Sequence, residues 1–332
     1  MVKYSKFFLG LLVIFSNNCL SQEKKIAYYD QINYAEANIL DSNYVKAAMH
    51  YDSAFFAQPK PFAKDYWNAL VCSIKNNDNQ KAFAFTQKLI LKGFDLTHFQ
   101  QPVFENFLKT KEWKSITENY DNLHRQYLKG INVRLKTTID SLFALDQGLR
   151  NSCGMEKCRT EILKIDSSNY VKLFEVIKRY GFPDENDLGT NNTKLRLPHF
   201  FLFYHYIQAN TGAVVYPILF NAMITHKFPP RYFAFCFNRG EMGDRRGKDL
   251  GLNLAIEIDD KTYFPKKNAA KININREELG LDSFEDYARK HEYMKNCNKS
   301  NIKQFEFDIW GGTSRYEFAT VEDKERFIST LK

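Results

Sequence analysis

Four common signatures of enzyme chemistry are absent from this sequence. It contains no Gly-x-Ser-x-Gly turn, on which many hydrolases present a nucleophilic serine. It contains no His-Glu-x-x-His helix and no Cys-x-x-Cys pair, the spacings that often hold zinc. The stretch from Gly243 to Gly247 is one residue short of a phosphate-binding loop and lacks the Ser or Thr that would bind magnesium. The sequence therefore predicts no metal site and no other cofactor.

Long apolar runs are also missing beyond the first residues, so no segment of the mature chain predicts a transmembrane helix. The one apolar run, residues 7–15, follows Lys3 and Lys6 and precedes polar residues, the order found in secretory signal peptides. It is much shorter than the roughly 20 residues that span a bilayer. We expect residues 1–21 to be cleaved and the mature chain to be periplasmic or secreted. A lipid anchor on Cys19 is the alternative, although the residues before it lack the usual pattern.

Charge of one sign does not dominate the chain. Its 332 residues include 47 Lys and Arg against 39 Asp and Glu, a net charge of +8, and the two signs are interspersed. This balance favours solubility rather than a nucleic-acid partner. The hydrophobic content of 44% is enough for a buried core, so a disordered chain is a poor interpretation.

Five cysteines remain after cleavage behind residue 21, and outside the cytoplasm they can oxidise. Cys153 and Cys158 are the favoured disulfide pair, because a short loop containing Gly154 can bring them together. Two free thiols are the alternative. The sequence does not decide whether Cys236 pairs with Cys297.

Residues 22–127 show the pattern of helical hairpins. Small and aromatic residues recur at helical spacing at Tyr44, Ala47, Tyr51, Ala54 and Pro59. This spacing resembles the second helix and exit turn of a tetratricopeptide repeat, and Ala82 stands 35 residues after Ala47, close to that family's period. The second copy is degenerate. The resemblance implies a small concave face that could bind a protein or peptide partner.

The rest of the chain predicts further helices and a little β structure. A continuous helical pattern over 122–150 predicts a helix that joins the two halves, and a second pattern predicts a helix over 277–294. Alternation on either side of Asp259 and Asp260 predicts a β-hairpin, and alternation over 305–309 predicts one more strand. The expected class is mainly α with a small β-hairpin (α+β), in which helical hairpins precede a helical domain with a short antiparallel sheet.

The expected organisation has five parts. They are a signal peptide (1–21), a tetratricopeptide-like domain (22–127), a connecting helix (128–145), a helical domain with the β-hairpin (146–295) and a tail with one strand (296–332).

The second half carries an ordered set of motifs. They are Asp146-Gln147-x-x-Arg150, Asp166 with Asn169, Tyr180-Gly181-Phe182-Pro183, the helix bearing His205, Asn238-Arg239, Asp259-Asp260-Lys261-x-Tyr263-x-Pro265 and Asn275-Arg276-Glu277-Glu278-Leu279-Gly280-Leu281. Over about residues 140–295 this order resembles the uncharacterised bacterial domain-of-unknown-function family 6624. The resemblance implies a fold rather than a reaction, because no activity is established for that family. Asn238-Arg239 stands where the family usually has an Asp-Arg pair, so a site present in relatives would be degraded here.

His205 is the candidate for a catalytic base. It lies in a strongly aromatic segment, where the imidazole would be partly desolvated, as a general base can be. A core histidine that is hydrogen-bonded to a carbonyl is the favoured alternative. Asp146, Arg150 and Arg239 could form an anion clamp, since a guanidinium group matches a carboxylate or phosphate. An ion pair between Asp146 and an arginine, holding helices together, is again the favoured alternative.

These observations predict an exported, non-enzymatic protein that binds a protein or peptide partner through its repeat domain. The alternative is a hydrolase that acts on material of the cell envelope, with His205 as base and Arg239 as the group that binds an anion.

Overall fold

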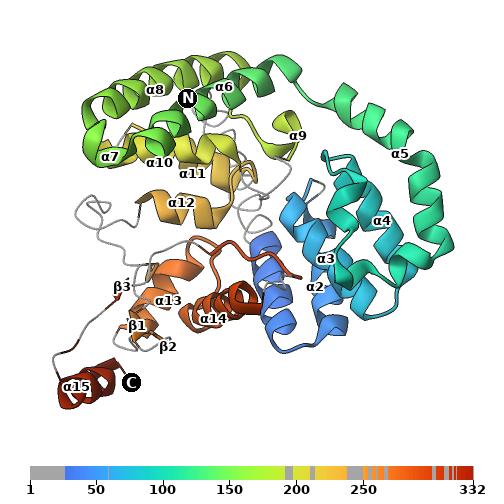
Figure 1. The fold of residues 1–332 in the computed structure, drawn as a ribbon. Coiled ribbons are helices and arrows are strands. Elements are labelled where there is room, and N and C mark those ends of the chain that lie inside the picture. Colours follow the sequence, from blue (N-terminus) through green and yellow to red (C-terminus); the bar gives the residue numbers. More distant parts are fainter. Residues whose placement is uncertain are drawn as a thin grey trace, which may run out of the picture.

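A computed structural model describes most of the chain. The described residues are 27–58, 60–190, 197–209, 214–237, 250–252, 256–258, 261–264, 268–300, 304–309, 314–315, 318 and 320–331. Within them the protein is mainly helical (Figure 1), which confirms the predicted mainly α class. The expected signal peptide, Cys19 and Pro59 lie outside the described residues. In the part that is described, no helix combines the length and hydropathy needed to cross a membrane.

The N-terminal half consists of two helical hairpins. The four helices are 27–40, α2 (Tyr44–Ala57), α3 (Ala63–Lys75) and α4 (Asn79–Ile90). Ser42 and Asn77 form the two turns with the same left-handed φ of 57°, and the side chains of Asn43 and Asp78 cap the helices that follow. The backbone bond from Asn43 to Asn38 recurs, 35 residues later, between Asp78 and Ser73. The two hairpins therefore turn in the same way.

The small and aromatic residues of the first hairpin are its core. Ala47, Tyr51 and Ala54 have no exposed surface. Three short 3-10 turns follow α4, namely η1 (Leu96–Phe99), η2 (Pro102–Phe104) and η3 (Phe107–Lys109). They bring Phe99 and Phe107 edge-on against Trp113 of α5 (Lys111–Gly130). These rings cover the last hairpin.

The prediction of a single helix over 122–150, which includes the connecting helix 128–145, is wrong. The chain forms α5 and then α6 (Val133–Ser152), with a break at Ile131 and Asn132. The Asn132 side chain accepts a hydrogen bond from Leu135 and so caps α6, while its own N–H bonds to the carbonyl of Asp187 at 2.9 Å. Apolar periodicity continues through this break because both helices bury one face, and the cap and the tertiary bond decide the change in direction.

The second half packs its helices around a second core. After α6 come α7 (Gly154–Lys157), α8 (Arg159–Tyr180), α9 (Glu185–Leu188), α10 (Pro198–Ala209), α11 (Tyr216–Ile224) and α12 (Pro230–Phe237). Phe200, Phe203 and Phe228 are fully buried in this core. His199 is equally buried among these rings.

The remaining elements are short strands and three helices. They are β1 (Ile256–Ile258), β2 (Lys261–Tyr263), α13 (Ala269–Glu277), α14 (Phe284–Ser300), β3 (Ser314–Arg315) and α15 (Val321–Leu331). β1 pairs antiparallel with β2 and parallel with β3. The predicted turn residues Asp259 and Asp260 lie outside the described residues, so the hairpin stays a prediction.

Two predictions for this region are wrong. The helix expected over 277–294 is divided into α13 and α14, because Gly280 adopts a left-handed φ of 68° and Asp282 binds the side chain of Arg276. The strand expected over 305–309 is not a strand. Side chains of α3, rather than a neighbouring strand, bond to the backbone of Gln304 and Glu306. The N–H of Phe305 donates to Tyr293 of α14, and the N–H of Ile309 bonds back to the carbonyl of Phe307.

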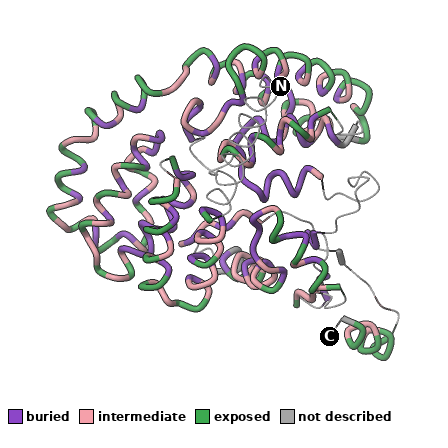
Figure 2. Tube along the Cα trace, turned by 180° about the vertical axis from the view of Figure 1, so that it is seen from behind, coloured by how far each residue is buried: buried purple, intermediate pink, exposed green. Residues whose placement is uncertain are grey.

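The two halves contact each other extensively. Figure 1 shows the helix 27–40 beside α14, and Glu36 forms an ion pair with Lys290 there. Asn33 donates to the carbonyl of Gly280 at 3.0 Å. On another side, Lys92 pairs with Glu185 at 2.7 Å. Buried residues line the inward side of these helices, whereas exposed residues follow their outer side (Figure 2).

Candidate functional site

The structure brings the predicted site residues Asp146, Arg150 and His205 together with Asp166, from three helices. Asp146 lies on α6 and His205 on α10, and Asp166, which belongs to the motifs of the second half, lies on α8. Asp146 and Asp166 are buried, and the His205 side chain is 12% exposed. Helical spacing places Asp146 and Arg150 on one face of α6, so that both reach α8 and α10.

Asp146 is the centre of this cluster, which we call the Asp146 cluster and which consists of Asp146, Gln147, Arg150, Asp166 and His205. Nδ1 of His205 lies 2.8 and 2.9 Å from the two carboxylate oxygens of Asp146. Gln147 donates to the same carboxylate at 2.6 Å, and Arg150 at 3.0 Å. Arg150 also donates to both oxygens of Asp166, at 2.8 and 2.7 Å. The bidentate pair fixes the guanidinium plane between the two acids.

This arrangement determines what His205 can do chemically. Every neighbour of the Asp146 carboxylate is a donor, so Nδ1 of His205 carries a proton and donates it. Nε2 then has the lone pair, and no hydrogen bond joins it to a described residue. An imidazole oriented by a carboxylate in this way can act as a general base. The same contacts also hold α6, α8 and α10 together.

The oxygen and nitrogen atoms of Asp146, Asp166 and His205 lie within 4.8 Å of one another, a spacing that could hold a cation. Arg150, however, already places its guanidinium between the two carboxylates. A metal ion would have to displace this bidentate ion pair, so the residues fit an arginine-neutralised pair better than a metal site.

The anion clamp is only partly described. Arg150 uses its guanidinium on Asp146 and Asp166, the ion pair that we favour as the alternative. Arg239 lies outside the described residues.

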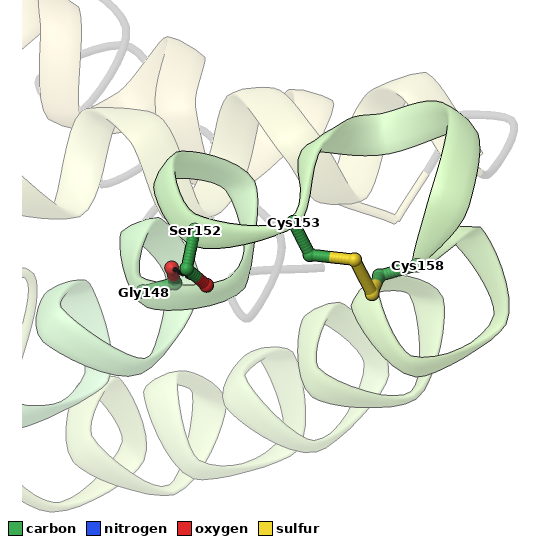
Figure 3. Close-up of a disulfide and its surroundings, with 4 residues drawn as sticks. All are labelled: Gly148, Ser152, Cys153 and Cys158. Atoms are coloured by element: carbon green, nitrogen blue, oxygen red, sulfur yellow. Dashed lines mark hydrogen bonds between the residues drawn. A yellow bond between two sulfur atoms is a disulfide. The ribbon is translucent and has the colours of Figure 1, made fainter.

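A disulfide closes the end of this region (Figure 3). It joins Cys153, at the end of α6, to Cys158, at the start of α8, with a Cα–Cα distance of 5.9 Å. The bridge therefore constrains the turn between the two helices that carry Asp146 and Asp166. Cys236 and Cys297 are buried thiols rather than a second disulfide.

A different site, which the sequence does not predict, lies on α3. Asn68 donates to the carbonyl of Glu306 at 2.7 Å and accepts from its N–H at 2.8 Å, while Trp67 donates to the carbonyl of Gln304 at 2.9 Å. We call residues 304–309 the tail segment, and Trp67 with Asn68 the docking face. One asparagine within a helix gives no sequence signal for such a contact. Alternation of the tail segment is visible in the sequence, but its partner is not.

Side chains of the tail segment alternate between buried and partly buried positions. Phe305 and Phe307 are 2% and 5% exposed and belong to the N-terminal core. The ring of Phe305 stacks on that of Tyr44, with the ring centroids 5.8 Å apart. Asp308 lies 3.6 Å from Lys64, at the start of α3. The docking face thus holds an extended peptide by its backbone and by alternate apolar side chains.

Comparison of this chain with family models, with curated proteins and with solved structures finds no match. The resemblances to tetratricopeptide repeats and to family 6624 therefore stay predictions.

Proposed function

We propose that this chain is an exported, non-enzymatic binding protein whose N-terminal domain holds extended peptide segments of protein partners on the docking face. The observation that supports this most is the reciprocal pair of hydrogen bonds between Asn68 and the backbone of Glu306. Backbone recognition does not depend on the side chain at that position, so a segment of another protein with a similar alternation could make the same bonds.

The equivalent turns of the two hairpins support a repeat origin for this domain. Their geometry recurs after 35 residues, the spacing that also separates Ala47 from Ala82. Tetratricopeptide-like repeats commonly serve as scaffolds that display helix faces to peptides. In this chain the tail segment occupies such a face, and a partner would compete with it.

The test uses a chain in which the tail segment is weakened. The double variant Phe305→Ala/Phe307→Ala removes the two buried rings, and a capped peptide with the sequence of residues 304–309 is then added and followed by fluorescence anisotropy. We expect saturable binding to the double variant and much weaker binding to the wild type, because the attached segment competes at an effective concentration of order 1 mM. Adding Asn68→Ala should weaken binding at least ~10-fold.

A peptide of the same composition, with its two Phe residues adjacent rather than alternating, is the control and should not bind. If the double variant folds, as judged by circular dichroism, and still does not bind the peptide, the proposal fails. Should the double variant not fold, the single variant Phe305→Ala replaces it.

A second candidate function rests on the Asp146 cluster. The carboxylate of Asp146 orients His205 so that Nε2 is left as a potential acceptor of a proton. This supports an enzyme, such as a hydrolase of envelope material, with His205 as general base and Arg239 binding an anionic group.

His205→Gln separates the two functions. Gln can still donate a hydrogen bond to Asp146 but cannot take up a proton near neutral pH. Turnover of a panel of chromogenic esters, glycosides and peptides that disappears in this variant, at an unchanged melting temperature, would favour the enzyme. If the wild type turns over none of these substrates, the binding protein remains the better proposal.

A further inference from the structure

A pocket lies where the two halves of the chain meet. The cavity has a volume of about 40 Å3 and opens to solvent. Its lining comes from the helix 27–40, from the start of α3, from the start of α12 and from Asp308 of the tail segment. It is separate from the Asp146 cluster, none of whose residues line it.

Arg231 lines this pocket, and one nitrogen of its guanidinium has no hydrogen-bond acceptor. Nη2 of Arg231 forms an ion pair with Asp282. The central carbon of the guanidinium lies 4.9 Å from the centroid of the Tyr287 ring. The side chain of Arg231 is 7% exposed, and Nη1 is buried without any hydrogen-bond partner. A buried charged donor that lacks an acceptor costs free energy. The chain itself does not supply that acceptor.

The position of Arg231 adds a second attraction for an anion. It is the second residue of α12, a helix of eight residues that begins at Pro230, and Pro229 and Pro230 also line the pocket. The N–H groups of Tyr232 and Phe233 already donate to the carbonyl of Pro229, so only the positive end of the helix dipole adds to the attraction. The dipole favours a negatively charged group near this end of α12.

The acidic residues nearby are already engaged. Asp282 pairs with Arg276 and Lys290 as well as with Arg231. Lys64 lies 3.0 Å from Asp65 and 3.6 Å from Asp308. Glu36, which also lines the pocket, pairs with Lys64 and Lys290. Each of these carboxylates thus has a cationic partner, although one oxygen of Asp65 and one of Asp282 accept no hydrogen bond, whereas Nη1 of Arg231 has no acceptor at all.

We propose that this pocket binds a carboxylate, one of whose oxygens accepts a hydrogen bond from Nη1 of Arg231. Guanidinium and carboxylate groups match in geometry and charge, and a desolvated site strengthens the bond between them. The carboxylate can belong to a small organic acid or to the C terminus of a peptide. This proposal does not depend on the docking face.

Ligand-observed 19F nuclear magnetic resonance tests it, with difluoroacetate as the probe and the full mature chain as the protein. We expect the difluoroacetate line to broaden, acetate to reverse the broadening and the neutral isostere acetamide to leave it unchanged. Absence of broadening at millimolar probe, or equal competition by acetamide, would overturn the proposal.

Arg231→Lys is the decisive variant, because a lysine retains the charge for Asp282 but has no second edge to present. It should weaken difluoroacetate binding at least ~10-fold. Arg289→Gln removes an arginine that does not line the pocket and should leave binding unchanged. If Arg231→Lys does not fold, a crystal of the wild type soaked in 3-bromopropionate should show bromine anomalous signal in the pocket, and signal only elsewhere would refute the site.

N-acetylglycine, which resembles a peptide C terminus, distinguishes the two sources of the carboxylate. Stronger competition by N-acetylglycine than by acetate would identify a peptide C terminus, whereas equal competition would identify a small acid. Both results support the pocket. If neither molecule competes with the probe, the pocket does not bind carboxylates.

Discussion

Asn68 and Glu306 are 238 positions apart, yet the side chain of the first satisfies both backbone groups of the second. This contact replaces the neighbouring strand that an extended segment normally needs, because each buried N–H and C=O must find a partner. It ties the end of the chain to the N-terminal domain.

Asn68→Ala is expected to loosen the tail segment without unfolding the protein. The loss of two hydrogen bonds should destabilise the docked tail by about 1–3 kcal/mol. Hydrogen exchange of the Glu306 amide should accelerate accordingly. Asn122→Ala, at an exposed position on α5, is the matched control and should change nothing. Unchanged exchange at Glu306 in Asn68→Ala would show that the tail does not depend on this side chain.

Gly189→Ala should destabilise the protein for two reasons. Gly189 has a φ of +69°, and an added Cβ would lie 2.4 Å from the hydroxyl of Tyr127. The backbone strain costs about 1–3 kcal/mol, and overpacking against the ring adds a similar amount.

Gly181→Ala is the control for the steric part of this cost. Gly181 has a φ of +80°, but no atom lies within 4 Å of the added Cβ. Chemical denaturation should therefore show a smaller loss for Gly181→Ala than for Gly189→Ala. Equal losses in the two variants would mean that Tyr127 moves aside without cost.

His199 should make the protein sensitive to acid. Burial lowers the pKa of His199 from 6.5 to about 3, and neither ring nitrogen has a hydrogen-bond partner. Below pH 6.5 the unfolded chain binds a proton that the folded chain does not, so stability falls as the pH drops towards 3, by up to about 1.4 kcal/mol per pH unit. Its contribution to stability is complete above pH 6.5.

His199→Phe is expected to raise stability and to flatten this part of the pH profile, because it removes two unsatisfied polar atoms and the titrating group. The free energy of unfolding, measured between pH 4 and 7 in both proteins, checks this. Parallel profiles would contradict the prediction.

Asp65 should have the opposite effect to His199 on the pH dependence of stability. Burial raises the pKa of Asp65 from 3.8 to about 6. The folded chain then holds a proton between these values that the unfolded chain releases, so this group favours folding below pH 3.8, and that contribution is lost as the pH rises through 6. In Asp65→Asn this loss should be absent, while Tyr28 can still donate to the amide oxygen. A slope between pH 4 and 6 that is unchanged in the variant would argue against it.

Local patterns in the sequence were sufficient for much of the secondary structure. Periodicity predicts α2 well, since amphipathic spacing acts within a few residues. Local patterns also single out Cys153 and Cys158 and place His205 in a helix. The same periodicity misses the breaks at Asn132 and Gly280, because apolar spacing continues across a turn whose direction is set by capping and tertiary bonds.

The sequence by itself determined the mainly helical class, because helical periodicity is a local property. Only the tertiary structure decided which distant groups meet. Asp146 with His205, Asn68 with Glu306, and Arg231 with its pocket each depend on how whole helices pack. A single polar residue has many possible partners along the chain, and the need to satisfy it once it is buried selects among them only after the fold has formed.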